Sequence, residues 1–207
     1  MIVILDCGIG NIKSVAKMIE KAGGEVVISN KTDDIIKATL IVFPGVGAFD
    51  NGISKLRGLE SFPHIERRVL EQEVIFIGIC LGMQLLFECS EEGRLPGLGW
   101  ISGKVIRFNF DKNTRKALKV PHMGWNVVEA GDANDLLKDN EELRFYFVHS
   151  FHAYNVNAQE IMGQSNYGYQ FVSAIARDNI YGVQFHPEKS HRFGLAFFKR
   201  FLSHIQC

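Results

Sequence analysis

The sequence predicts an α/β fold, with a mostly parallel central sheet flanked by helices and a smaller antiparallel or mixed β portion in the second half. In the first half, short continuous apolar runs alternate with segments of helical period, as in parallel sheets covered by helices. After Gly97 the chain changes to short β-like segments separated by turn residues. A length of 207 residues, with 46% hydrophobic and 22% charged residues, suits one core, so we expect residues 1–207 to form a single domain.

In the first half, the expected elements begin with a buried strand and continue into a helix. Residues 2–5 are an uninterrupted apolar run, and residues 11–21 place apolar side chains on one helical face. Gly23 and Gly24 end this helix. The same patterns predict strands at 25–29, 40–43 and 74–77, helices at 49–56 and 64–71, and a turn at 78–82 that leads into a helix at 81–88.

In the second half, β-branched and aromatic residues predict a series of short strands. These strands cover 105–110, 126–129, 145–148, 171–177 and 181–185. The polar segment 109–119 predicts a surface hairpin or loop, and the helical period of residues 193–205 predicts a final helix.

Composition excludes several classes of protein. Twenty-three basic and 23 acidic residues give a net charge of zero, which argues against general nucleic-acid binding. The four cysteines (Cys7, Cys80, Cys89 and Cys207) form no C-x-x-C pair, so we expect no zinc ribbon, no metal site and no dithiol redox motif. Residues 2–5 lack the basic flank of a signal peptide, and no apolar run reaches the roughly 20 residues that cross a bilayer. We therefore expect a cytoplasmic protein that does not contact membranes.

The segment around Cys80 has the pattern of a nucleophile elbow. A buried run is followed by Gly78, Cys80 and Gly82 in a G-x-C-x-G turn and then by an apolar helix. Such a turn strains the central residue and projects its side chain at a helix N-terminus, where the reactive thiolate is favoured. The alternative is that Cys80 is one more small buried residue, a common place for cysteine.

A nucleophilic thiol needs a base, and the base needs a group that orients it. His186-Pro187-Glu188 follows directly on the predicted strand 181–185. Side chains two residues apart in an extended chain project to one side, so Glu188 can hold the His186 ring. An exposed histidine beside a solvated glutamate is the alternative interpretation of this tripeptide taken alone.

Acyl transfer also requires N–H donors for an oxyanion. The N–H of Leu81, directly after the nucleophile, is one candidate. The glycine-rich segment 43–49 follows a strand, and Gly45 and Gly47 let its backbone approach a ligand, so this segment is expected to supply a second donor. A plain turn is the alternative.

Together these motifs resemble the class I (triad) glutamine amidotransferases, and among them the glutaminase subunits of imidazole glycerol phosphate synthase. The similarity extends over nearly the whole chain. It includes Gly-Ile-Gly-Asn at 8–11, Pro-Gly-Val-Gly-Ala-Phe at 44–49, Pro-His-Met-Gly-Trp-Asn at 121–126, His-Ser-Phe at 149–151 and Gln-Phe-His-Pro-Glu-Lys-Ser at 184–190. One departure is Cys7, where these subunits usually carry tyrosine; it lies outside the triad.

The resemblance implies a flavodoxin-like core and a reaction without a cofactor. Cys80 would attack the side-chain amide of L-glutamine, giving a thioester and ammonia, while His186 and Glu188 complete the triad. Residues of the family's glutamine site would bind the substrate here: Gly45, Gly47, Gln84, His149, Ser150 and Phe151.

The resemblance further implies a heterodimer with a (βα)8-barrel cyclase subunit that consumes the ammonia. The residues expected to face this partner are Asn11, Lys13, Met123, Trp125, Asn126 and Lys189. For Trp125 the alternative is a core aromatic residue, and for the two lysines it is a solvated surface.

Other functions stay open at this point. A paralogous glutaminase could supply ammonia for sugar amidination in surface-polysaccharide biosynthesis. A stand-alone cysteine hydrolase, such as a γ-glutamyl hydrolase or a cysteine peptidase, would use the same triad, although the segment 121–126 speaks against it. A non-enzymatic regulator with a vestigial elbow is disfavoured, because Cys80, His186 and Glu188 are all present. NAD binding is disfavoured because Lys13 replaces the third glycine of G-x-G-x-x-G.

Overall fold

One sheet runs through the whole molecule, and its first part is parallel. The computed structural model describes residues 1–111, 118–138 and 142–205. Five strands lie in the order β2-β1-β3-β4-β12, and all neighbours in this part are parallel. They are β1 (Ile2–Leu5), β2 (Val26–Ser29), β3 (Leu40–Gly45), β4 (Ile75–Cys80) and β12 (Ile180–Val183).

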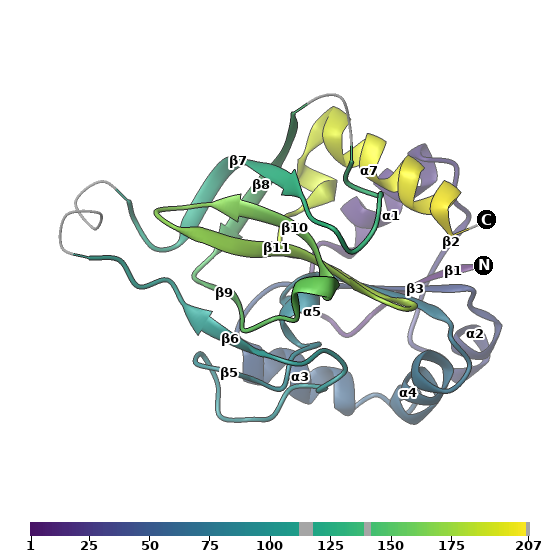
Figure 1. The fold of residues 1–207 in the computed structure, drawn as a ribbon. Helices are drawn as coiled ribbons and strands as arrows, with labels where there is room; N and C mark the ends of the chain where they lie inside the picture. Colours follow the sequence, from purple (N-terminus) through teal and green to yellow (C-terminus); the bar gives the residue numbers. More distant parts are fainter. Residues whose placement is uncertain (112–117, 139–141, 206–207) are drawn as a thin grey trace.

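Helices cover both faces of the parallel part (Figure 1). On one face, α1 (Ile12–Lys21) packs against α7 (His191–His204). The other face carries α2 (Thr32–Lys37), α3 (Phe49–Arg57) and α4 (Phe62–Leu70). Successive strand residues alternate between two apolar clusters: Val42 belongs to the cluster under α1 and α7, and Phe43 to the cluster under α3 and α4.

Beyond β12 the same sheet continues with antiparallel strands. The order β12-β11-β10-β7-β8 places the second half of the chain at this side. The strands are β7 (His122–Ala130), β8 (Leu143–His149), β10 (Ile161–Asn166) and β11 (Gln170–Arg177). A branch of β5 (Cys89–Ser90), β6 (Lys104–Arg107) and β9 (Phe151–Tyr154) joins at β11. The predicted fold class is therefore confirmed.

The helix predicted at 81–88 is wrong in length. Strand β4 extends through the predicted turn to Cys80, and helix α5 covers only Leu81–Gln84. After Gln84 the N–H groups of Leu86 and Phe87 bond carbonyls three residues back, and the N–H of Glu88, which would continue the helical ladder by bonding to Gln84, donates to the Gly103 carbonyl instead. A loop distant in sequence thus ends α5 after one turn.

Several elements escaped the sequence patterns. The short helix α2 and the strands β5, β9 and β10 were not expected, and neither were the 3-10 turns η1 (Ala158–Glu160) and η2 (Pro187–Lys189). The strand predicted at 105–110 ends at Arg107 as β6. Most of the polar segment predicted at 109–119 lies outside the described residues. Within the described ranges, no helix is both long enough and apolar enough to span a membrane.

Candidate active site

Cys80 lies at the junction of β4 and α5 in a strained backbone conformation. Its φ of 56° and ψ of −109° fall outside the regions that L-residues usually adopt. A side chain at Gly78 would overlap the carbonyl of Gly82, and one at Gly82 would overlap the carbonyl of Phe43. Both glycines are therefore required for the close approach of strand and helix that places Cys80 beside the cavity described below.

His186 reaches Cys80 because β12 is the parallel neighbour of β4. The pairing of Val183 with Ile79 brings the residues after β12 beside the end of β4. The imidazole Nδ1 lies 2.8 Å from Oε1 of Glu188, and both side chains are buried. The expected extended geometry is wrong, because Glu188 lies in the 3-10 turn η2, which folds its carboxylate back onto the ring.

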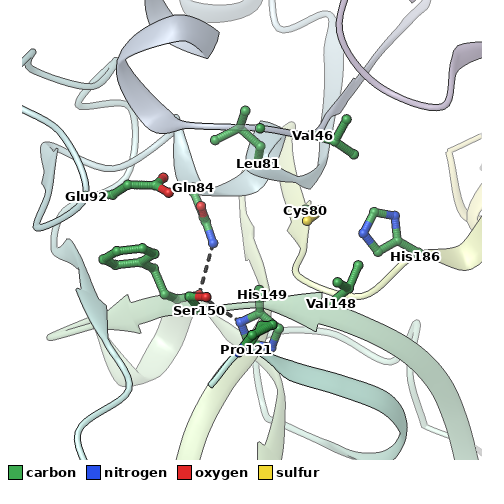
Figure 2. Close-up of a pocket in the computed structure, with 12 residues that line it drawn as sticks. Val46, Cys80, Leu81, Gln84, Glu92, Pro121, Val148, His149, Ser150 and His186 are labelled. Atoms are coloured by element: carbon green, nitrogen blue, oxygen red, sulfur yellow. Dashed lines mark hydrogen bonds between the residues drawn. The ribbon is translucent and has the colours of Figure 1, made fainter. Parts of the chain in front are cut away.

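The other ring nitrogen of His186 is turned toward the Cys80 sulfur (Figure 2). Among the described residues, this buried Nε2 makes no hydrogen bond. Burial disfavours a charged ring, but the neighbouring Cys80 and Glu188 outweigh it and raise the pKa of His186 to about 10. The site therefore favours a protonated His186 ring between Cys80 and Glu188.

A cavity of about 330 Å³ opens beside the Cys80 sulfur. This volume lies at the small end of ligand-binding pockets, which suits a ligand of amino-acid size. Eight of the residues expected to act in the site line it: Gly47, Cys80, Leu81, Gln84, His149, Ser150, Phe151 and His186. Gly45 lies behind this wall, paired with Cys80 across the β3–β4 ladder. Glu188 does not line the cavity but contacts Nδ1 of His186, which does.

Glu92 is a site residue that the sequence analysis missed. Its carboxylate lines the cavity and accepts a hydrogen bond of 2.9 Å from the N–H of Phe49, at the start of α3. Asp50 accepts the N–H groups of Arg94 and Leu95, which fixes the loop that carries Glu92. Figure 2 shows Glu92 beside Gln84, across the cavity from Cys80. The loop therefore places a negative charge at the end of the cavity remote from the nucleophile.

The wall opposite Cys80 is held by a chain of hydrogen-bonded side chains. His149 Nδ1 lies 2.7 Å from the Phe151 carbonyl, which can only accept, so Nδ1 carries the proton. His149 Nε2 then accepts from Nδ1 of His122, 3.0 Å away. Nε2 of His122 in turn accepts from the Asn126 amide at 3.3 Å. One backbone carbonyl thus determines the tautomers of both rings.

These histidines are neutral in the folded protein. Burial lowers the pKa of His149 to about 3 and that of His122 to about 4. Burial also lowers the pKa of His152, whose Nε2 lies 2.8 Å from the Tyr169 hydroxyl. Phe108 contacts all three rings. In the described parts of the chain, no three His, Cys, Asp or Glu side chains are grouped as metal ligands.

The residues expected to face a partner lie on β7, on η2 and at the start of α1. Met123 and Trp125 are 61% and 47% exposed, and they project from β7 on the same side. This exposure shows that Trp125 is not a core residue; its ring stacks on that of His191, with the ring centroids 5.7 Å apart. Lys189 lies over the ring of Tyr146, with Nζ 5.7 Å from its centre. Lys13 is exposed and Asn11 is half-buried at the start of α1.

Asn126 differs from these residues in its orientation. Its amide donates to the Asn166 carbonyl at 2.8 Å and to His122, so it faces the hydrogen-bonded wall of the cavity. Alternation along β7 explains this, because residues 122, 124 and 126 point away from the side that carries Met123 and Trp125.

Comparison with known proteins places the whole chain in one family. The family model Glutamine amidotransferase class-I matches residues 3–205. Subunits named imidazole glycerol phosphate synthase subunit HisH 2, from Methanococcus maripaludis and Pseudomonas aeruginosa, are each 44% identical, and each match covers 98% of both chains. A solved glutamine amidotransferase (TM-score 0.75, 16% identity, 99% of each chain covered) and PurLQS from Thermotoga maritima (TM-score 0.72, 16% identity, 99% and 98% covered) share the fold. The chain therefore belongs to the class-I glutamine amidotransferase family, and within it to the relatives of HisH.

Proposed function

We propose that this chain is the glutaminase subunit of an imidazole glycerol phosphate synthase, in which Cys80 hydrolyses L-glutamine to glutamate and ammonia. One observation carries the proposal. The Cys80 sulfur, the His186 ring and the Glu188 carboxylate are neighbours in that order at one end of a small cavity, and the Glu92 carboxylate lies at its other end. The HisH names of the relatives support the assembly and the pathway, histidine biosynthesis.

The proposed reaction begins with the thiolate of Cys80, which attacks the carbon of the substrate's side-chain amide. The N–H of Leu81 and an N–H from the loop at Gly47 stabilise the oxyanion that forms. His186 gives its proton to the leaving ammonia, and a thioester remains on the sulfur. His186 then takes a proton from water, which attacks the thioester and releases glutamate. Glu188 keeps the ring oriented and stabilises its charge throughout.

The cavity suits the amino-acid end of glutamine. The Glu92 carboxylate lies at the end remote from Cys80, where it complements an α-ammonium group. Gln84 and the segment 149–151 line the wall between these two ends. A substrate with its ammonium at Glu92 therefore extends its amide toward the sulfur.

A partner beside the cavity accounts for the exposed apolar surface of β7. Pro121, just before β7, and Val148 of β8 line the cavity. Met123, which is the partner of Val148 in the sheet, and Trp125, two residues later on β7, are exposed. Ammonia that escapes to solvent is protonated and lost as a nucleophile, so a site for its use must lie close to the cavity. We propose that the cyclase subunit docks on this surface, with Lys13 and Lys189 at its edge.

Glutamate release tests this proposal. Purified chain is assayed with glutamine alone and with a co-expressed cyclase that carries its nucleotide ligand, and Cys80→Ala serves as the blank. We expect release that rises with the loaded partner and is absent in Cys80→Ala. Release that persists in Cys80→Ala would contradict the role of the sulfur.

Two relatives carry the numeral 2 in their names, which keeps a second acceptor under consideration. In that alternative the same glutaminase supplies ammonia to a sugar-amidinating partner. Glutaminase activity that responds to such a partner, and does not respond to an authentic cyclase with its ligand, would favour the alternative and leave the triad chemistry unchanged.

A further inference from the structure

Gln184 is a buried carboxamide directly beside the nucleophile. It follows β12, two residues before His186, and the β12–β4 register brings it next to Cys80. Its side chain is fully buried, and Nε2 lies 3.7 Å from the Cys80 sulfur at hydrogen-bond geometry. Burying an amide that makes no hydrogen bonds costs free energy, so the hydrogen-bond partners of this side chain are informative.

The orientation of this amide is determined by a backbone carbonyl on the opposite wall. The Phe151 carbonyl can only accept, so the atom of Gln84 that lies 3.0 Å from it must be the NH₂ group. The same NH₂ group lies 3.0 Å from the Gln184 side chain, which must present its oxygen there. The remaining atom of Gln184, the one that faces Cys80, is therefore its NH₂ group.

We propose that Gln184 is a positioning residue that donates an N–H to the Cys80 sulfur and stabilises it as a thiolate, with Gln84 and the Phe151 carbonyl fixing the direction of that donation. This inference rests on the proposed function and deepens it. A hydrogen bond to an ionised group is about twice as strong as a neutral one, so the donor favours the thiolate over the thiol. Gln84 then has a second task besides lining the cavity.

Alkylation of Cys80 by iodoacetamide, measured across pH, tests the proposal without glutamine or a partner. Cys89→Ser serves as the background, because tryptic peptide 69–94 then contains Cys80 as its single cysteine. Cys7 lies in another peptide, and burial raises the pKa of its thiol to about 12. The titratable groups near the sulfur and the cavity are His186, Glu188, Glu92 and His149. No variant below changes these four, and one variant adds a carboxyl group of its own at position 184.

Two substitutions test whether Gln184 acts as a hydrogen-bond donor to the sulfur or only fills space. Gln184→Met keeps volume and removes the donor; we expect alkylation at neutral pH to slow on the order of tenfold, with the midpoint of the pH profile moved upward by about one unit. Gln184→Glu keeps the acceptor for Gln84 and sets a carboxylate against the sulfur, so a larger upward shift is expected. In both variants the plateau rate at high pH should be retained.

Ser173→Ala is the matched control. Ser173 is a buried polar residue on the neighbouring strand β11, and its hydroxyl contacts Ser165. We expect it to leave the alkylation midpoint unchanged. A midpoint that does not move in Gln184→Met and Gln184→Glu, measured on variants that keep cooperative unfolding, would overturn the proposal. Absence of glutaminase activity with any partner would instead overturn the proposed function, so the two failures are distinguishable.

Discussion

The two walls of the cavity are built in different ways. On the Cys80 wall, backbone packs directly on backbone, because glycines allow β3, β4 and α5 to approach closely. On the opposite wall, which β7 and β8 supply, side chains are held by other side chains: Asn126, His122 and His149 form one hydrogen-bonded chain. The first wall fixes its geometry by steric exclusion, whereas the second depends on which ring nitrogens carry protons. We therefore expect the first wall to be disrupted by substitution of its glycines and the second by protonation of its histidines.

The largest expected effect is on the backbone wall. Gly82→Ala places a Cβ against the carbonyl of Phe43, where neither backbone can yield, and we expect the free energy of unfolding to fall by about 3 kcal/mol or more. Urea-induced unfolding measures this loss. Gly23→Ala is the control: its φ is positive, at 99°, whereas that of Gly82 is not, and nothing lies within 4 Å of its added Cβ, so about 1 kcal/mol is expected from backbone strain alone. Equal losses in the two variants would remove the steric explanation.

Acid should affect the second wall. The unfolded chain protonates its histidines near pH 6.5, whereas burial holds the folded pKa of His122 at about 4 and of His149 at about 3. Below pH 6.5 the unfolded state binds more protons, so the free energy of unfolding decreases as pH falls, by about 1.4 kcal/mol per unit for each such histidine. This stability is complete above pH 6.5 and is lost progressively toward pH 4.

Urea unfolding between pH 7 and pH 4 checks this dependence by its slope. His122→Gln should reduce the slope of the free energy of unfolding against pH by about 1.4 kcal/mol per unit, which corresponds to one proton. His64→Gln is the control, since His64 is exposed on α4, and its slope should match that of the parent. A slope that does not change in His122→Gln would show that the second wall does not depend on a neutral ring at this position.

The smallest effect on the chain itself is expected outside both walls. Trp125→Ala removes a half-exposed ring, so the free energy of unfolding should change by less than about 1 kcal/mol, and Cys80 alkylation should be unaffected. Glutamine-dependent synthase activity of the complex should nevertheless fall, because the ring belongs to the proposed docking surface. Tyr154→Ala, an exposed aromatic on β9, is the control. Unchanged synthase activity in Trp125→Ala would contradict this placement.

Features that depend on neighbours in sequence were predictable. The elbow combines a buried strand with glycines two residues on either side of Cys80, and this local pattern is readable without the fold. The proximity of Glu188 to His186 was likewise predictable, although the turn that produces it was not. The parallel and antiparallel halves followed from the change of pattern after Gly97.

Features that depend on distant segments were not predictable. Helix α5 does not continue to residue 88 because the N–H of Glu88 donates to the Gly103 carbonyl, 15 residues later in the chain, and not to the Gln84 carbonyl. Glu92 looks like any charged surface residue until the N–H of Phe49 holds it in the cavity. Gln184 was visible as part of a motif, and its position two residues before His186 was a usable signal. Its orientation, however, requires the Phe151 carbonyl, 33 residues earlier in the chain.

The Phe151 carbonyl has one further consequence, which concerns proton conduction. It accepts from His149 on one side and from Gln84 on the other, so two runs of donors converge on an atom that has no proton to pass on. Carboxamides are equally poor carriers, because relaying a proton would require their unstable imidic acid form. The hydrogen bonds that connect Asn126 to Cys80 through the Phe151 carbonyl can therefore orient the side chains along them but cannot conduct a proton to or from the sulfur. The proton that leaves the sulfur stays with His186 until ammonia carries it away.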